Sequence, residues 1–165
     1  MFPQRRMRRA RTRHIQPLLR EITLTKNDLI APLFVNETIS VPRSIDAMPG
    51  QFNYPNDGIE AVAANLWKRG IRAVLLFGIP KEKDPKACSA FDAEGVVQQA
   101  VRRIKAEVPG MVVITDVCAC EYTDHGHCGI VGEGRNGPDL LNDPSLELIG
   151  SPAILDSLAL VDFAS

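Results

Sequence analysis

The sequence predicts an α/β fold in which helices cover a sheet of parallel strands. Three short apolar runs, at 28–35, 73–78 and 111–117, alternate with two amphipathic segments, and glycine and proline separate them. The order strand, helix, strand, helix, strand is the βαβ pattern, which requires parallel strands. A doubly wound open sheet and a (β/α)8 barrel both have this pattern. Because the sequence holds no G-x-G-x-x-G after the first run and no P-loop, the nucleotide-binding open sheet lacks its usual signature.

The first elements are predicted from apolar spacing and turn residues. The run DLIAPLFV at 28–35 predicts a buried strand, and 41–58, with three prolines and two glycines, predicts a loop. In 58–70 apolar residues recur at helical spacing, and Gly70 stands where a helix C-cap belongs. The apolar positions of this helix are Ile59, Val62, Ala63, Leu66 and Trp67.

The later elements repeat the same alternation. The run AVLLFG at 73–78 is continuously apolar, as expected of a strand buried on both faces. A polar loop at 80–92 precedes a second amphipathic helix at 93–110, which stops at its final Pro-Gly pair. Its apolar side is formed by Val97, Ala100, Val101 and Ile104. The run MVVITDV at 111–117 predicts a third buried strand.

Length and composition indicate one globular domain. The chain has 165 residues, of which 45% are hydrophobic and 24% charged. No apolar run approaches the roughly 18 residues of a membrane-spanning helix, and no secretion signal is recognisable. Four cysteines in such a chain favour reduced thiols or metal ligands over disulfides. We therefore expect a cytoplasmic protein that does not bind membranes.

Positive charge is concentrated near the N-terminus. Six of the 19 basic residues lie in 5–13, which leaves 13 basic against 20 acidic residues, a net charge of about −7, for the rest. Such an arm can bind nucleic acid, direct targeting, dock on an acidic neighbour or simply be solvated. Because it has no interleaved aromatic residues and the body has no nucleic-acid motif, we expect docking or solvation and no nucleic-acid partner.

The segment DVCACEYTDHGHCG at 116–129 is the candidate functional site. If the third strand continues through it, Asp116, Cys118 and Cys120 point the same way at the C-terminal end of that strand, where α/β enzymes place their chemistry. The loop that follows holds two glycines and can return Cys128 to the same point. Three thiolates suit zinc, and three protein ligands leave a position open for water or substrate.

Other interpretations of this segment remain open. His125 or His127 can complete a closed, structural zinc site, or the cysteines can be small buried residues without a metal. The pattern assigns Asp124 and the two histidines no role beyond shaping the loop and supporting the ligands. Cys88 stands alone in a polar loop and is interpreted as incidental.

The segment VVITDVCACEYTDHGHCGI resembles the zinc segment of the porphobilinogen synthase family, also called delta-aminolevulinic acid dehydratase. Other stretches resemble the family in the same order, from about residue 5 to residue 148: the arginine-rich arm, LREITLTKNDLIAPLFV, SIDAMPG, GIRAVLLFGIP, AFDAEGVVQQAVRRIK and NDPSLEL. Magnesium-dependent relatives replace these cysteines, so the resemblance is to the zinc-dependent type.

The resemblance implies a fold and an assembly. The family forms a (β/α)8 barrel with an extended N-terminal arm that embraces a neighbouring subunit, usually in a homo-octamer. By this resemblance the chain is divided into an arm at 1–27, the first three or so βα units of the barrel at 28–148, and a divergent tail at 149–165. The tail suggests a frameshift, an alternative splice end or an incomplete gene model.

The resemblance also implies an activity and a site. The family is a hydro-lyase that condenses two molecules of 5-aminolevulinate to porphobilinogen, with loss of two waters, early in haem synthesis. Cys118, Cys120 and Cys128 match its Zn²⁺ ligands, and Asp116 matches an acid beside the metal.

The lysines that the family uses as nucleophiles have no counterpart in this sequence. The family forms Schiff bases through two lysines in segments that look like SYAAKYASAFYGPFR and VMVKPA, and neither segment occurs here. The lysines present all lie in loops or on polar helix faces, without the burial that activates such a nucleophile; they are Lys26, Lys68, Lys81, Lys83, Lys86 and Lys105. We therefore expect the isolated chain to be inactive. Because three βα units cannot close a barrel and leave an apolar strand edge exposed, we also expect it to be marginally stable at best. The alternative function is a non-catalytic zinc-binding or assembly fragment that caps full-length subunits.

Overall fold

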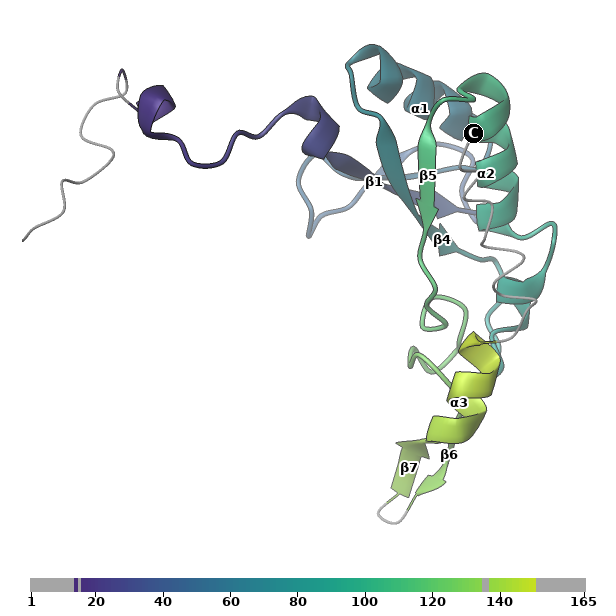
Figure 1. Cartoon of the computed structure of the whole chain (residues 1–165). Helices are drawn as coiled ribbons and strands as arrows, with labels where there is room; N and C mark the ends of the chain where they lie inside the picture. The colour runs from purple at the N-terminus through teal and green to yellow at the C-terminus, as the bar shows by residue number, and fades with distance from the viewer. Residues whose placement is uncertain (1–13, 15, 135–136, 151–165) are drawn as a thin grey trace, which may run out of the picture.

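The computed structural model describes residues 14, 16–134 and 137–150, and these form an α/β fold (Figure 1). The basic stretch at 5–13 and the tail from 151 lie outside the described residues. Residues 16–28 run away from the sheet and contain two 3-10 helices, η1 (Gln16–Leu19) and η2 (Lys26–Asp28) (Figure 1).

The three predicted strands are confirmed, and they pair in parallel. They are β1 (Ile30–Asn36), β4 (Ala73–Ile79) and β5 (Val112–Thr115), with β4 in the middle. β1 begins two residues later than predicted because the Thr25 hydroxyl and the Asp28 carboxylate form a capping box that holds η2.

The predicted loop at 41–58 contains two short strands, which corrects that prediction. β2 (Arg43–Ser44) pairs antiparallel with β3 (Phe52–Tyr54), and β3 pairs in parallel with the C-terminal end of β1. The sheet is therefore mixed, in the order β2-β3-β1-β4-β5. Strands of two and three residues are too short to show an alternating pattern, so their apolar spacing predicts nothing.

Both predicted helices are present, and their ends are set by glycines. α1 (Ile59–Lys68) lies between Gly58 and Gly70, which have φ of +96° and +93°. α2 (Val96–Glu107) begins three residues later than predicted, because Gly95 has extended backbone angles and its N–H bonds to Asp92 in a turn.

The hydrophobic core lies between the helices and one face of the sheet. Leu33, Val74 and Leu76 point into it from the strands, and Ile59 and Ile104 from the helices. Each crossover runs from one strand through a helix to the next strand in the same direction along the sheet, and α1 and α2 pack against each other on that face (Figure 1).

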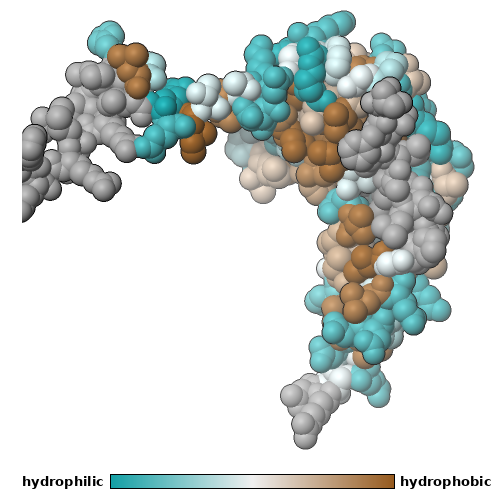
Figure 2. Space-filling view, viewed as in Figure 1, coloured by the Kyte–Doolittle hydropathy of each residue, from teal (hydrophilic) through white to brown (hydrophobic). Residues whose placement is uncertain are grey.

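The opposite face of the sheet is only partly covered by the described residues. Along β4, Val74 and Leu76 are buried, whereas Leu75 and Phe77 are half-buried. The expectation that 73–78 is buried on both faces is thus not confirmed in the described part of the chain. Figure 2 shows apolar side chains gathered over the strands on the side away from the helices.

A smaller unit follows the sheet. A hairpin of β6 (Val131–Gly134) and β7 (Gly137–Leu140) leads into helix α3 (Asn142–Ile149) (Figure 1). Among the described residues, no helix combines the length and the apolar character needed to cross a bilayer.

Candidate metal centre

Strand β5 delivers the chain to the cysteine segment, but the strand does not continue through it. It ends at Thr115, so the expected alternation of Asp116, Cys118 and Cys120 along one strand face is wrong. The chain instead makes a tight turn in which the Ala119 carbonyl accepts hydrogen bonds from the N–H groups of Tyr122 (3.0 Å) and Thr123 (2.9 Å).

The three predicted ligands nevertheless converge. The Sγ atom of Cys118 lies 2.9 Å from that of Cys120 and 3.1 Å from that of Cys128. The Ala119 N–H donates to the Cys128 sulfur at 3.3 Å, which orients this thiol toward the other two. All three side chains are half-buried, whereas Cys88 is exposed and outside the cluster.

A small second core holds this segment against the loop after β4. Its buried members are Ala87, Ala90, Ala119 and Tyr122, and Cys128 and Leu148 pack against it. The Tyr122 carbonyl also accepts a hydrogen bond from the N–H of Asp84. The cysteine segment therefore has a packed base and is not a free loop.

The exit of the segment is tied to α3. The N–H of Ile130 donates to the hydroxyl of buried Ser145 at 2.9 Å, and this hydroxyl donates to the Leu141 carbonyl. Gly129 has φ of +150°, and a Cβ there would collide with the Ser145 side chain. Glycine is therefore required where the chain passes Ser145.

The two histidines of the segment stack on each other. Their rings are 5.6 Å apart, and the N–H of His127 donates to Nδ1 of His125 at 3.1 Å. A neutral His125 whose Nδ1 accepts a hydrogen bond carries its proton on Nε2. That Nε2 atom is buried and has no partner in the described structure, while Asp124 is exposed.

Burial changes the protonation of two groups here. Burial raises the pKa of the Cys118 thiol well above its usual range, and contacts with Cys120 and Cys128 add to the rise. Burial also raises the pKa of Glu121 to about 7; the Asp116 carboxylate adds to this rise, and a backbone hydrogen bond from Gly78 opposes it. Asp116 is exposed, and it lies close enough to Glu121 to raise the pKa of that carboxyl.

The donor set fits zinc after a small movement. Zinc bonded to sulfur at about 2.3 Å places two tetrahedral sulfur ligands about 3.8 Å apart. The sulfurs at 2.9 and 3.1 Å would therefore separate by less than about 1 Å. In the described ranges, no three His, Cys, Asp or Glu side chains are already arranged to hold a metal ion.

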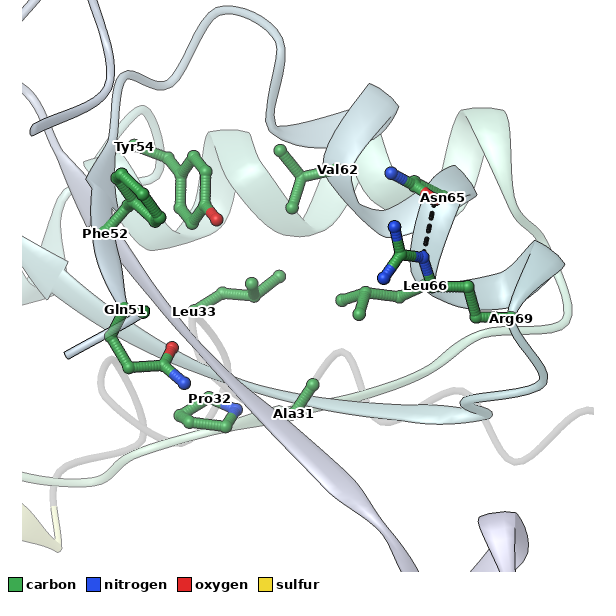
Figure 3. Close-up of a pocket in the computed structure, with 11 residues that line it drawn as sticks. Ala31, Pro32, Leu33, Gln51, Phe52, Tyr54, Val62, Asn65, Leu66 and Arg69 are labelled. Carbon is green, nitrogen blue, oxygen red and sulfur yellow. Dashed lines mark hydrogen bonds between the residues drawn. The ribbon is translucent and has the colours of Figure 1, made fainter. Parts of the chain in front are cut away.

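A separate hollow lies on another part of the sheet. Residues of β1, β3 and α1 surround a volume of 420 Å³, with Phe52 and Tyr54 on one side and Arg69, held by Asn65 at 3.1 Å, on the other (Figure 3). Its lining includes Leu33 but no cysteine. It therefore does not belong to the thiol cluster.

Comparison with known proteins identifies the family. The sequence model of the delta-aminolevulinic acid dehydratase family matches residues 4–165, nearly the whole chain. The chain belongs to this family. The dehydratase of Ruminiclostridium josui is 42% identical over 146 residues, which cover 88% of this chain and 71% of that protein.

Other dehydratases are about twice as long as this chain. Those of Archaeoglobus fulgidus and Synechocystis are 44% and 43% identical and match over 93% and 98% of the chain, but over only 46% and 50% of their own length. A crystal structure of the Toxoplasma gondii dehydratase with its reaction product porphobilinogen superposes with a TM-score of 0.82, at 24% identity, over 98% of this chain and 45% of that one. This likeness shows the fold.

Sequence reasoning missed two side chains of this dehydratase segment. Glu121 and Thr123 stand in it as single residues between cysteines and histidines. Their burial arises from the turn at Ala119 and from packing on the loop after β4, and no periodic pattern announces either.

Proposed function

We propose that this chain supplies the metal-binding half of a zinc-dependent porphobilinogen synthase, which condenses two molecules of 5-aminolevulinate to porphobilinogen. One observation carries this proposal: three thiols converge in a member of the dehydratase family. The Cys118 sulfur lies 2.9 Å from the Cys120 sulfur and 3.1 Å from the Cys128 sulfur. A set of three thiolate ligands suits zinc and does not suit magnesium, which binds oxygen ligands.

The arrangement of the sheet supports a partial (β/α)8 barrel. In a doubly wound sheet the strand order reverses and helices cover both faces. Here β1, β4 and β5 advance in one direction, and α1 and α2 pack together on one face. The other face is apolar, as the inside of a barrel is, with Phe34 stacked on Phe77 at 5.2 Å.

Cys118, Cys120 and Cys128 would hold the zinc, with the Ala119 N–H orienting the last of them. When bound, the metal supplies Lewis-acid polarisation of a substrate carbonyl or a lowered pKa of bound water. Three protein ligands would leave a fourth position for water or substrate, and the Nδ1 atom of His125 already accepts a hydrogen bond from the His127 N–H. Asp116 would act as a supporting acid from the end of β5.

The lysines of this chain are not placed to act as the two Schiff-base nucleophiles of the complete reaction. Five of the six are exposed, and the ammonium of half-buried Lys105 bonds to the carbonyls of Pro109 and Met111. No described lysine therefore has the apolar burial that a Schiff-base nucleophile needs. The proposal places those nucleophiles, and the rest of the barrel, outside these 165 residues.

A complementation experiment tests this proposal. The chain is co-expressed with the C-terminal half of the Archaeoglobus fulgidus relative, and porphobilinogen formation from 5-aminolevulinate is measured. We expect no product from either half alone and product from the pair, abolished by Cys118→Ser and unaffected by Cys88→Ser. Product formed equally well by the Cys118→Ser pair, or by a chelated pair, contradicts the zinc-dependent function.

The second candidate function is a non-catalytic fragment that caps full-length subunits. The apolar side chains of the N-terminal segment favour it, since Leu18, Ile22 and Leu24 are 83%, 80% and 67% exposed. The intact mass of the native protein separates the two: a mass near twice 18.1 kDa supports the synthase. A mass of 18.1 kDa, with co-purified full-length enzyme that loses activity as the chain is added, supports the fragment.

A further inference from the structure

The cysteine segment contains two turns, and a buried hydroxyl closes the second. Thr123 is 1% exposed, and its N–H completes the first turn by donating to the Ala119 carbonyl at 2.9 Å. Its hydroxyl donates to the carbonyl of His127 at 2.9 Å, across four residues. One side chain thus links the turn that follows Cys118 to the residue that precedes Cys128.

The His127 carbonyl is held from both sides of Cys128. The Thr123 hydroxyl donates to it from one side, and the N–H of Gly129 from the other, at 3.1 Å. Gly126, with φ of +71°, allows the chain to reverse between these points. The Ala119 N–H then meets the Cys128 sulfur at 3.3 Å, so backbone groups of a single residue anchor both Thr123 and Cys128.

The His127 carbonyl has a hydrogen-bond donor without Thr123. The Gly129 N–H already bonds to the His127 carbonyl, so the hydroxyl adds a second donor to an acceptor that has one. The effect that remains is geometric: the hydroxyl fixes the span from 123 to 127. Without it, the described side-chain hydrogen bonds across Gly126 reduce to the one from the N–H of His127 to Nδ1 of His125, which does not reach back to Thr123.

We infer that Thr123 is a positioning residue whose hydroxyl delivers Cys128 to Cys118 and Cys120. The inference rests on the metal centre of the proposed function, and it adds the residue that assembles that centre. Loss of groups that orient metal ligands typically lowers metal affinity about 10- to 100-fold. Because Thr123 acts through Cys128, the third ligand, we expect its loss to lower the affinity by an amount in this range.

The test compares Thr123→Val, which keeps the shape and removes the hydroxyl, with Thr123→Ser, which keeps the hydroxyl. Thr38→Val is the matched control, because it removes an exposed threonine hydroxyl that donates to Asn36 at 2.7 Å, away from the cysteines. All variants carry Cys88→Ser and are purified in whatever assembly the chain forms. Two quantities are measured: Zn²⁺ affinity by chelator competition, and the rate at which a short bifunctional thiol reagent links Cys128 to Cys118 or Cys120.

Thr123→Val is expected to lower Zn²⁺ affinity about 10- to 100-fold and to slow the cross-link, while Thr123→Ser and Thr38→Val behave as the parent. Unchanged affinity and cross-linking in folded Thr123→Val overturn the inference. If the parent itself binds no Zn²⁺, the proposed function fails, and the cross-linking rate alone decides whether Thr123 positions Cys128. Should Thr123→Val not fold, Thr123→Ala is compared with Thr123→Ser instead. If Thr123→Ala also fails to fold, the positioning role is overturned, because the hydroxyl is then needed for the fold as a whole.

Discussion

Gly78 has no side chain, and this allows the sheet to approach the cysteine segment closely. It lies near the end of β4, where the chain approaches α2 and Tyr122 closely. A Cβ at this position would lie 2.5 Å from Cγ2 of Val97 and 2.7 Å from the Tyr122 hydroxyl oxygen. Since Tyr122 belongs to the small core beneath the cysteines, this contact connects the sheet to the cysteine segment.

Replacing Gly78 by alanine is therefore expected to destabilise the chain by about 1–3 kcal/mol, through overpacking between β4 and α2. Urea unfolding followed by the fluorescence of Trp67, the single tryptophan, measures the change. Adding Val97→Ala to Gly78→Ala removes the closest clashing atom and should recover part of the loss, so that the two changes are not additive. An unchanged unfolding midpoint for Gly78→Ala contradicts this account.

At the scale of elements, the ends of helices and strands decide how the site is presented. β5 ends at Thr115, and the turn at Ala119 brings the thiols together where a continued strand would have placed two of them on one face. At the other end of the sheet, η2 is held by the Thr25–Asp28 capping box. The same principle governs both, because backbone groups that lack a partner in a regular element are satisfied locally.

The capping box predicts a pH effect that can be measured on one carboxyl. The Thr25 hydroxyl donates to the Asp28 carboxylate at 2.7 Å and, with the Thr25 N–H, holds the pKa of Asp28 below its usual 3.8. Because the folded-state pKa is lowered, this stabilisation is present above the usual pKa and is lost as the pH falls through the lowered value.

In Thr25→Val the hydroxyl is absent and the N–H remains, so the pKa of Asp28 should rise part of the way back toward 3.8, as an NMR titration would record. Thr38→Val is again the matched control and should leave Asp28 unchanged. An Asp28 pKa that is the same in Thr25→Val as in the parent would assign the whole effect to the backbone N–H.

At the scale of the whole molecule, the exposed sheet face and edge control behaviour in solution. β5 pairs with β4 on one side only among the described strands, and its Val112 is 48% exposed. An apolar strand edge of this kind is a template for pairing with another chain.

Val112→Lys is expected to reduce self-association of the isolated chain, because a charged side chain at an exposed edge opposes strand pairing. Sedimentation velocity measures the association, and circular dichroism checks that the fold persists. Ala106→Lys, on the exposed side of α2, adds the same charge away from the edge and should have little effect. Equal reductions by both variants would assign the change to net charge.

The sequence by itself determined the parts of this protein that depend on local patterns. The three strands and two helices follow from apolar spacing and the end of α1 from Gly70, and the three cysteines that the sequence singles out do lie together. These features were predictable because hydrophobic periodicity and turn residues act over a few positions along the chain.

Only the tertiary structure decided how those parts meet. The short strands β2 and β3 exist through pairing with each other and with β1. Thr123 is buried and Glu121 half-buried in a segment whose neighbours Ala119 and Tyr122 pack on the loop after β4. The sulfurs converge through the Ala119 turn and not through strand alternation. The strand pairings join residues distant in sequence, and the Ala119 turn has no glycine or proline to announce it, so local spacing holds no signal for either.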